Sequence, residues 1–235
     1  MPATGSARFR RTPPDGPLGA VARVRLKLTE IFHSLQGEAD SAGWPTVFVR
    51  LTGCPLRCEY CDTAYAFTGG EWWEIQRVLE RVGEFGTRYV CVTGGEPLAQ
   101  RACLALLTAL ADAGYRVSLE TSGAMPIDAV DPRVIRVVDV KTPASRESHR
   151  NLYEQLELLR AEEQVKFVIC DRADYEWSRS LLERLGLAAR VNVLFSPSHD
   201  RLPARDLAEW ILADRLNVRL QLQLHKYLWG NEPGR

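Results

Sequence analysis

Short apolar segments alternate with longer amphipathic segments along almost the whole chain, and this alternation constrains the fold more than any other feature. Short apolar runs bounded by turn residues predict buried strands, whereas apolar residues at a helical period predict helices. We expect strands at 26–32, 46–51, 89–92, 116–120, 134–140, 165–170, 190–195 and 218–224, and helices at 73–82, 99–113, 148–161, 173–186 and 203–215. This order predicts an α/β protein with a parallel sheet built from βα units.

The number of units limits how far the sheet can close. About six or seven units are too few for a closed barrel of eight. We therefore expect an open, partial barrel, with a doubly wound sheet as the competing topology. Residues 1–24 are rich in Arg, Pro and Gly and are expected to form a flexible extension, and residues 25–235 are expected to form a single domain.

Composition narrows the functional classes. Hydrophobic residues make up 46% of the chain, charged residues 26%, and the formal net charge is zero. This balance is typical of a globular protein and gives no sign of a nucleic-acid or membrane surface. The chain opens without the apolar core of a signal peptide, and its longest apolar stretch, at 103–111, is too short to span a bilayer. A reducing, cytoplasmic setting is expected, where clustered cysteines indicate metal binding or catalysis.

Three of the six cysteines, Cys54, Cys58 and Cys61, stand within eight residues in the spacing C-x3-C-x2-C. Three thiols are too few for a closed structural zinc site, which needs four ligands, and a disulfide framework needs an even number of cysteines. They suit a cubane iron–sulfur cluster that leaves one iron open, because each cluster iron normally takes one thiolate. A zinc site with a distant fourth ligand is the alternative. The other three cysteines, Cys91, Cys103 and Cys170, lie in apolar segments and are expected to be buried.

Polar residues gather where the predicted strands end. In α/β barrels and open sheets, ligands bind at the carboxyl ends of the strands. We therefore expect the candidate functional residues to lie together at this one edge of the sheet, which we call the mouth. They are Cys54, Thr93, Glu96, Glu120, Ser122, Lys141, Ser196 and His225.

Lysine is rare in this chain. Of the 30 basic residues only four are lysines: Lys27, Lys141, Lys166 and Lys226. A chain that otherwise uses arginine for surface charge can keep lysine where an ammonium group is needed, although genomic base composition gives the same bias. Lys166 lies inside a predicted strand, where a site role and a plain structural role are both open.

The cysteine spacing, with Tyr60 directly before the last cysteine, resembles the radical S-adenosylmethionine (SAM) superfamily. The resemblance implies a [4Fe–4S] cluster on the three cysteines and SAM on the open iron, where reductive cleavage gives a 5′-deoxyadenosyl radical. The segment Gly94-Gly95-Glu96-Pro97 is similar to the superfamily's glycine-rich motif. Its glycines allow close backbone approach, and its carboxylate can meet the SAM amino group.

Further motifs, in chain order, resemble the 7-carboxy-7-deazaguanine synthase family. They are the segments 34–38, 61–63, 93–97, 120–123, 139–143 and 223–226. The resemblance implies a partial (βα)6-type TIM barrel, the radical SAM fold, with an N-terminal hairpin extension. It also implies a lyase that converts 6-carboxy-5,6,7,8-tetrahydropterin into 7-carboxy-7-deazaguanine with loss of ammonia, with Mg²⁺, an electron donor such as flavodoxin, and a homodimer.

The same resemblance implies a role for each matching position. Cys54, Cys58 and Cys61 would hold the cluster, and Thr63 would offer its hydroxyl to Mg²⁺. Many relatives carry Asn where this chain has Ser122. SAM would contact Tyr60, Asp62, Gly94, Gly95, Glu96, Ser122, Lys141, Thr142 and Pro143, with Ser196 a further candidate. The substrate would contact Leu35, Gln36, Gly37, Glu38, Arg50, Thr93, Glu120 and His225.

Two other functions remain open at this point. A glycyl-radical-enzyme activase shares the short cysteine spacing but would not require the set of Gln36, Thr63 and His225. A zinc-stabilised binding module without turnover would contain zinc and no iron. The sequence leaves open whether the product serves tRNA modification or a 7-deazapurine natural product.

Overall fold

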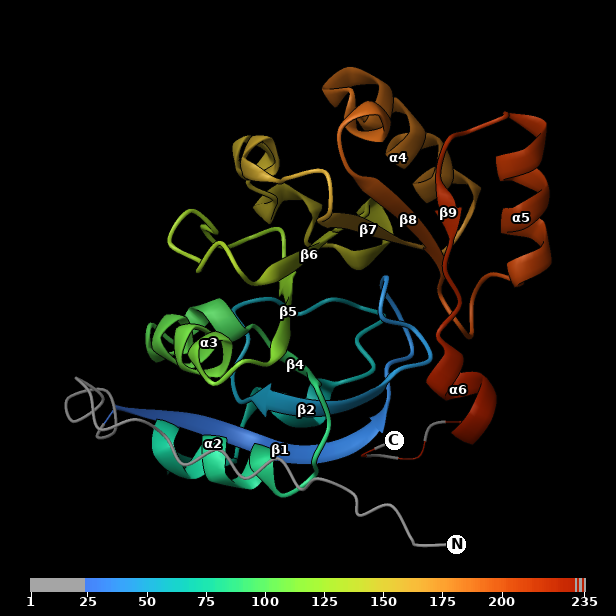
Figure 1. Ribbon diagram of the computed structural model, residues 1–235. Helices are drawn as coiled ribbons and strands as arrows, with labels where there is room; N and C mark the ends of the chain where they lie inside the picture. Colours follow the sequence, from blue (N-terminus) through green and yellow to red (C-terminus); the bar gives the residue numbers. More distant parts are fainter. Residues whose placement is uncertain (1–23, 231, 233, 235) are drawn as a thin grey trace, which may run out of the picture.

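A computed structural model of the chain describes residues 24–230, 232 and 234. They form one mixed sheet with the strand order β3-β1-β2-β4-β5-β6-β7-β8-β9, flanked by helices (Figure 1). The predicted flexible extension, residues 1–24, lies outside the described residues except for Val24, so its flexibility stays a prediction.

The strands and helices follow the predicted alternation. The strands are β1 (Arg25–Leu35), β2 (Pro45–Leu51), β3 (Glu71–Glu74), β4 (Tyr89–Gly94), β5 (Arg116–Ser122), β6 (Ile135–Val140), β7 (Gln164–Ile169), β8 (Asn192–Pro197) and β9 (Arg219–Leu220). The described helices are α2 (Ile75–Gly83), α3 (Ala102–Asp112), α4 (Arg172–Leu185), α5 (Ala204–Ala213) and α6 (Leu224–Trp229). None of these helices combines the length and apolar character needed to cross a membrane.

The sheet is an open barrel with a hairpin at its amino-terminal side. β1 pairs antiparallel with both β2 and β3, whereas every pair from β2–β4 to β8–β9 is parallel. β3 and β9 form the two ends of the row, so the described sheet does not close on itself. The predicted open barrel with an N-terminal hairpin is therefore confirmed, and the doubly wound alternative is not.

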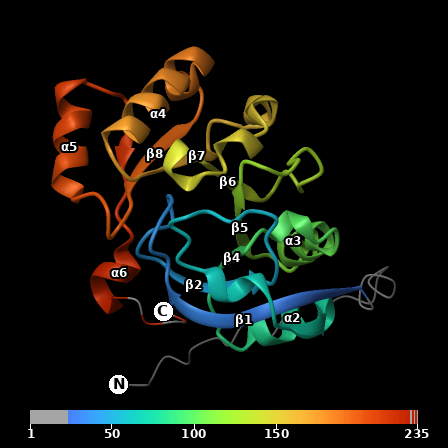
Figure 2. The ribbon, with the colours of Figure 1, turned by 180° about the vertical axis from the view of Figure 1, so that it is seen from behind.

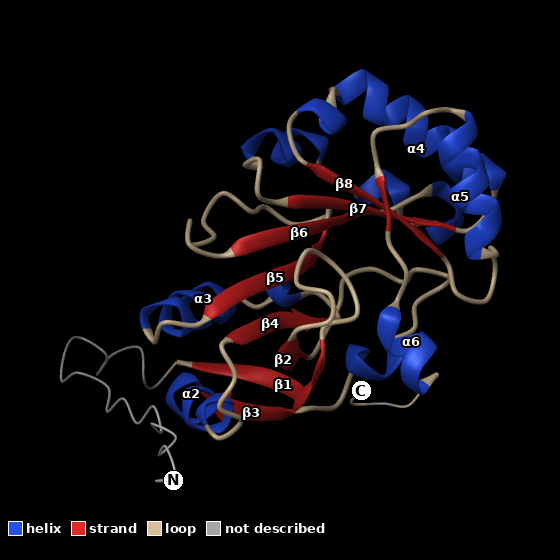
Figure 3. Ribbon diagram, turned by 45° about the vertical axis from the view of Figure 1, so that its right-hand side comes forward, coloured by secondary structure: helices blue, strands red, loops and turns tan. Residues whose placement is uncertain are grey.

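Alternation along the strands divides the sheet into an apolar outer face and a polar inner face. Val90 and Val92 belong to the main hydrophobic core, as do Val165 and Phe167. Successive side chains on a strand point to opposite faces, so Thr93 and Lys166 point to the other side. Figures 1 and 2 show α2 to α5 around the outside of the curved sheet. In Figure 3, α6 lies apart from these helices, beside loops at the mouth.

The prediction of a helix at 148–161 is wrong. The structure has only short 3-10 turns there, Ser148–Arg150 and Tyr153–Leu158, separated by extended backbone at Asn151. The Asn151 side chain makes hydrogen bonds to Lys141, and Leu152 N donates to Gly123 O at 2.7 Å. These bonds compete with helix formation because they tie the backbone to the ends of β5 and β6.

Two other boundaries differ from expectation. The predicted helix at 73–82 begins only at Ile75, because residues 71–74 pair with β1 as the short strand β3. The predicted last strand, 218–224, ends at Leu220. Leu224 N instead donates to Gly37 O at 3.0 Å, which draws the chain into α6 against the turn after β1. His225 therefore lies on a helix and not directly after a strand.

Candidate active site

The cysteine loop leaves β2 and packs against the glycine turn at the end of β4. Gly53 N donates to Ala66 O, and Glu96 N donates to Gly53 O, each at 2.8 Å. A β-carbon at Gly95 would lie 2.3 Å from Gly53 O, so only glycine permits this approach of two backbones. The fold therefore brings together the two motifs predicted to bind the cluster and SAM.

The three motif thiols are free and only partly buried, whereas Cys91, Cys103 and Cys170 are buried as predicted. Burial raises the pKa of all three motif thiols, to about 11 for Cys58, and the Lys141 ammonium opposes this rise. Among the described residues, no three His, Cys, Asp or Glu side chains converge on a single metal ion. A cubane needs no such convergence, because each thiolate binds a different iron, so these residues fit a cluster.

Glu96, the acidic residue of the glycine turn, is fully buried. Its carboxylate accepts hydrogen bonds from Leu98 N at 2.9 Å, the Thr121 hydroxyl at 2.7 Å, and both Ser122 N and the Ser122 hydroxyl. Burial raises the pKa of Glu96, and these four donors oppose that rise. Glu96 thus joins the ends of β4 and β5, and its contact with SAM stays a prediction.

The side chain of Asn151 holds the backbone of Lys141 on both sides, and the sequence motifs did not predict this role. Its side chain accepts from Lys141 N at 2.9 Å and donates to Lys141 O at 2.8 Å. The Lys141 ammonium lies 3.1 Å from Asp139 Oδ2. Burial would lower the pKa of Lys141, but Asp139 and other nearby acidic groups outweigh burial and raise it. Asn151 lies near the start of the segment wrongly predicted as a helix, at 148–161, and no sequence motif marked it as a site residue.

Thr142 and Tyr60 flank Lys141 on the predicted SAM side. The Thr142 hydroxyl lies 2.9 Å from Val168 O and 3.0 Å from Oδ2 of the buried Asp174 and can donate to either one, so its side chain packs against the start of α4. The Tyr60 hydroxyl is buried and has no hydrogen-bond partner among residues 24–230. The remaining predicted positions lie at strand ends or turns around the mouth: Leu35, Gly94, Pro143 and Ser196.

A partly buried glutamate, Glu120, lies at the centre of the predicted substrate side. Gln36 Nε2 donates to its Oε1 at 3.2 Å, and the Thr93 hydroxyl donates to its Oε2 at 3.1 Å. Burial and the nearby Glu38 carboxylate raise the pKa of Glu120, which Lys166 partly offsets. The predicted substrate residues Gln36, Thr93 and Glu120 therefore form one hydrogen-bonded group on the concave face.

Arg50 lies beside this group, paired in register with Thr93 across β2 and β4. Its Nε donates to Glu30 Oε1 at 2.7 Å, and Tyr65 donates to the same oxygen at 2.8 Å. Burial would lower the pKa of Arg50, but Tyr65 and Glu30 outweigh it and raise that pKa. Glu30, which was not predicted as a site residue, orients the guanidinium of Arg50. The two terminal nitrogens of Arg50 make no hydrogen bond to a described residue.

The carboxyl-terminal helix α6 joins the cysteine loop to the turn after β1. Lys226 Nζ lies 2.9 Å from Asp62 Oδ2, and the Thr63 hydroxyl donates to Asp62 Oδ1 at 2.8 Å. Partial burial acts to raise the pKa of Asp62, but Lys226 outweighs it and lowers that pKa. His225 packs so closely on Gly37 that a β-carbon there would lie 2.1 Å from His225 Nδ1. Burial lowers the pKa of His225.

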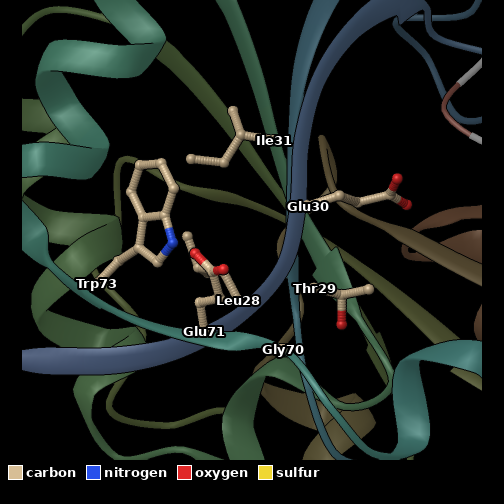
Figure 4. Close-up of a pocket in the computed structure, with 7 residues that line it drawn as sticks. All are labelled: Leu28, Thr29, Glu30, Ile31, Gly70, Glu71 and Trp73. Carbon is tan, nitrogen blue, oxygen red and sulfur yellow. The ribbon is translucent and has the colours of Figure 1, made fainter.

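A cavity of about 430 Å³ lies elsewhere, between β1 and β3. Figure 4 shows Glu30 and Trp73 on opposite sides of the β1 ribbon, so Glu30 is directed away from Trp73. None of the residues predicted to bind the cluster, SAM or substrate lines this cavity. Its lining is Leu28, Thr29, Glu30, Ile31, Gly70, Glu71 and Trp73.

Comparison with known proteins agrees with this arrangement. The radical SAM superfamily matches residues 48–138, which contain the cysteine loop and the glycine turn. The chain is 45% identical to the 7-carboxy-7-deazaguanine synthase of Chlorobaculum tepidum, covering 87% of this chain and 94% of that protein. It is 42% identical to the synthase of Koribacter versatilis, covering 88% and 98%.

Solved structures show the same fold. The crystal structure of QueE from Escherichia coli matches with a TM-score of 0.74 and 26% identity, covering 90% of this chain and all of that one. The structure of Streptococcus suis SuiB shares the fold alone, at a TM-score of 0.53 and 14% identity. The sequence relatives cover nearly the full described length and carry one common name. The chain therefore belongs to the 7-carboxy-7-deazaguanine synthase family of the radical SAM superfamily.

Proposed function

We propose that this lyase forms 7-carboxy-7-deazaguanine from 6-carboxy-5,6,7,8-tetrahydropterin, with ring contraction and loss of ammonia. One observation carries the proposal: a partly buried carboxylate, Glu120, and an oriented guanidinium, Arg50, lie on the same concave face, where Thr93 bonds Glu120 and is the register neighbour of Arg50. A pterin carries N–H donors on its pyrimidine edge and a carboxylate at the other end. Glu120 is suited to accept from the first, and Arg50 to bind the second.

Cys54, Cys58 and Cys61 would hold the [4Fe–4S] cluster that membership of the superfamily implies, and SAM would lie against Gly94, Gly95 and the Lys141 peptide. When bound, the cluster and SAM supply a 5′-deoxyadenosyl radical to abstract hydrogen from the substrate. The chain's own part is to hold the reactants in place. Asn151 fixes the Lys141 peptide, and Glu96 fixes Ser122 beside it.

Mg²⁺ binding is proposed at Thr63. Magnesium prefers hard oxygen ligands and retains several waters or substrate oxygens, so one protein hydroxyl fits such a site. Asp62 orients that hydroxyl, and Lys226 holds Asp62. In this arrangement Thr63 presents its oxygen at the end of the cysteine loop, next to the Asp62 that α6 contacts.

The family comparison supports the synthase over the glycyl-radical activase and the zinc-stabilised module, since the relatives of high identity bear the synthase name. A cytoplasmic setting, a homodimer, and electron transfer from a donor such as flavodoxin stay predictions from the family resemblance. So does the expectation that the chain binds neither nucleic acid nor membrane.

Anaerobic incubation of the reconstituted protein with SAM, a reductant, Mg²⁺ and 6-carboxytetrahydropterin tests the proposal. Mass spectrometry is expected to detect 7-carboxy-7-deazaguanine together with 5′-deoxyadenosine. Deoxyadenosine without that product would overturn the substrate assignment and leave the radical chemistry standing. Zinc in place of iron after anaerobic purification would overturn the cluster assignment.

A further inference from the structure

Lys166 is a lysine inside the curved sheet that the roles assigned above do not use. It lies on β7 between Val165 and Phe167, both of which belong to the outer hydrophobic core. Alternation along the strand therefore directs Lys166 to the concave face. Its side chain is only 12% exposed. An ammonium at such a position requires close anionic partners.

Two carboxylates from different parts of the chain supply those partners. Lys166 Nζ lies 2.7 Å from Glu38 Oε2 and 3.8 Å from Asp139 Oδ2. Glu38 belongs to the turn after β1 that carries the predicted substrate residues, whereas Asp139 lies opposite Lys166 in the register of β6 and β7. Asp139 is itself fixed by Lys141. Lys166 therefore connects the turn after β1 to the sheet.

The Glu38 carboxylate uses only one of its oxygens in this contact. Glu38 Oε1 is buried and has no hydrogen-bond partner among the described residues. A buried carboxylate oxygen without a donor is unfavourable, so its presence indicates a ligand group that donates to it. The backbone of the same residue is already bonded: Glu38 N donates to Gln36 Oε1 at 3.2 Å, which ties the turn to the Glu120 group.

Lys166 also separates like charges. The Glu38 carboxylate raises the pKa of Glu120, and Lys166 opposes that effect. Without the ammonium, Glu38 and Glu120 would repel each other, and Arg50 would still act on Glu120. The lysine thus favours the position of Glu38 close to Glu120.

We propose that Lys166 is a positioning residue for the substrate: anchored at Asp139, its ammonium fixes Glu38 so that Glu38 Oε1 accepts a hydrogen bond from the bound pterin. The inference rests on the proposed function, because it takes a donor-rich heterocycle as the ligand. It assigns Lys166 no contact with the reacting atoms.

Steady-state assays of the reconstituted enzyme test the proposal. Lys166→Met is expected to raise the KM for 6-carboxytetrahydropterin about tenfold, while the KM for SAM and the iron content stay unchanged. Lys166→Arg, which keeps the charge, is expected to recover part of the loss. Lys27→Met, at a lysine on β1 to which no site role is assigned, is the matched control. An unchanged pterin KM in Lys166→Met, or an equal rise in both KM values, would overturn the positioning role.

A double-mutant cycle separates action through Glu38 from a structural effect. If Lys166 acts by fixing Glu38, then Glu38→Gln with Lys166→Met has the same pterin KM as Glu38→Gln alone. The double variant leaves no unpaired charge and stays informative if the single lysine variant does not fold. A further tenfold rise in the double variant would contradict the proposal. Absence of product from the unaltered enzyme would instead overturn the proposed substrate, whatever the lysine variants do.

Discussion

Two glutamates at neighbouring strand ends, the fully buried Glu96 and the partly buried Glu120, show how the partners of a residue decide its role. Glu96 accepts four hydrogen bonds from the protein, and these donors join the ends of β4 and β5. Glu120 has two donors, both side chains that belong to the predicted substrate group. Both residues follow predicted strands, so their position was predictable, but their hydrogen bonds were not.

The pH dependence of substrate capture follows from the Glu120 environment. Burial and Glu38 raise the pKa of Glu120, so kcat/KM is expected to fall as pH decreases through a value above that of an ordinary glutamate. Glu38→Gln removes the like charge, lowers the pKa of Glu120 and moves this acid limb to lower pH. The measurement is kcat/KM for the pterin against pH. Asp40→Asn, at an exposed ion pair with Arg219, is the control, and an acid limb that moves upward in Glu38→Gln would contradict the assignment.

Thr63 gives a second prediction for a single residue. Thr63→Ala removes the hydroxyl proposed for Mg²⁺, so stimulation by Mg²⁺ is expected to fall about tenfold or more. The cluster should stay intact, because Thr63 O still accepts from Ala66 N at 2.9 Å and the loop keeps its turn. Activity with and without Mg²⁺ measures the first effect, and iron content the second. Thr68→Ala is the control; full stimulation in Thr63→Ala would remove this residue from the metal site.

Among the structural elements, those with a clear period were predictable and those fixed by long-range bonds were not. The strands β4, β5 and β7 begin or end within two residues of expectation, because short buried apolar runs have few alternatives. The segment 148–161 has helix-forming residues, yet Asn151 ties it to Lys141. A bond between residues ten positions apart in sequence leaves no periodic signal, which is why both the segment and the residue were missed.

Asn151→Ala tests this contact. The variant loses two hydrogen bonds to the Lys141 peptide and is expected to be less stable by about 1–3 kcal/mol. The free peptide should also weaken SAM binding roughly tenfold, since small displacements of a binding group lower affinity and rate strongly. Thermal unfolding and the KM for SAM are the two measurements. Asn217→Ala, at an exposed side chain, is the control; loss of stability with normal SAM binding would leave Asn151 a structural role only.

At the scale of the whole molecule, the turn after the first strand and the last helix of the described chain meet at the mouth. The turn after β1 carries Gln36, Gly37 and Glu38, and α6 lies on it through His225. α6 also reaches the cysteine loop through Lys226 and Asp62. All these residues belong to motifs found in the sequence, but only the fold shows that one short helix connects the turn after β1 to the cysteine loop.

Gly37→Ala tests whether this contact shapes the mouth. The added β-carbon would lie 2.1 Å from His225 Nδ1, so either the turn or α6 must move. Because α6 is short and lies outside the main core, global stability is expected to change little, while the KM for the pterin rises about tenfold. Hydrogen exchange should show faster exchange confined to α6. Gly83→Ala, where a β-carbon meets only Tyr115 at 3.7 Å, is the control. Normal pterin KM together with faster exchange in α6 would show that the helix can leave the mouth without loss of substrate, and His225 would then have no part in binding.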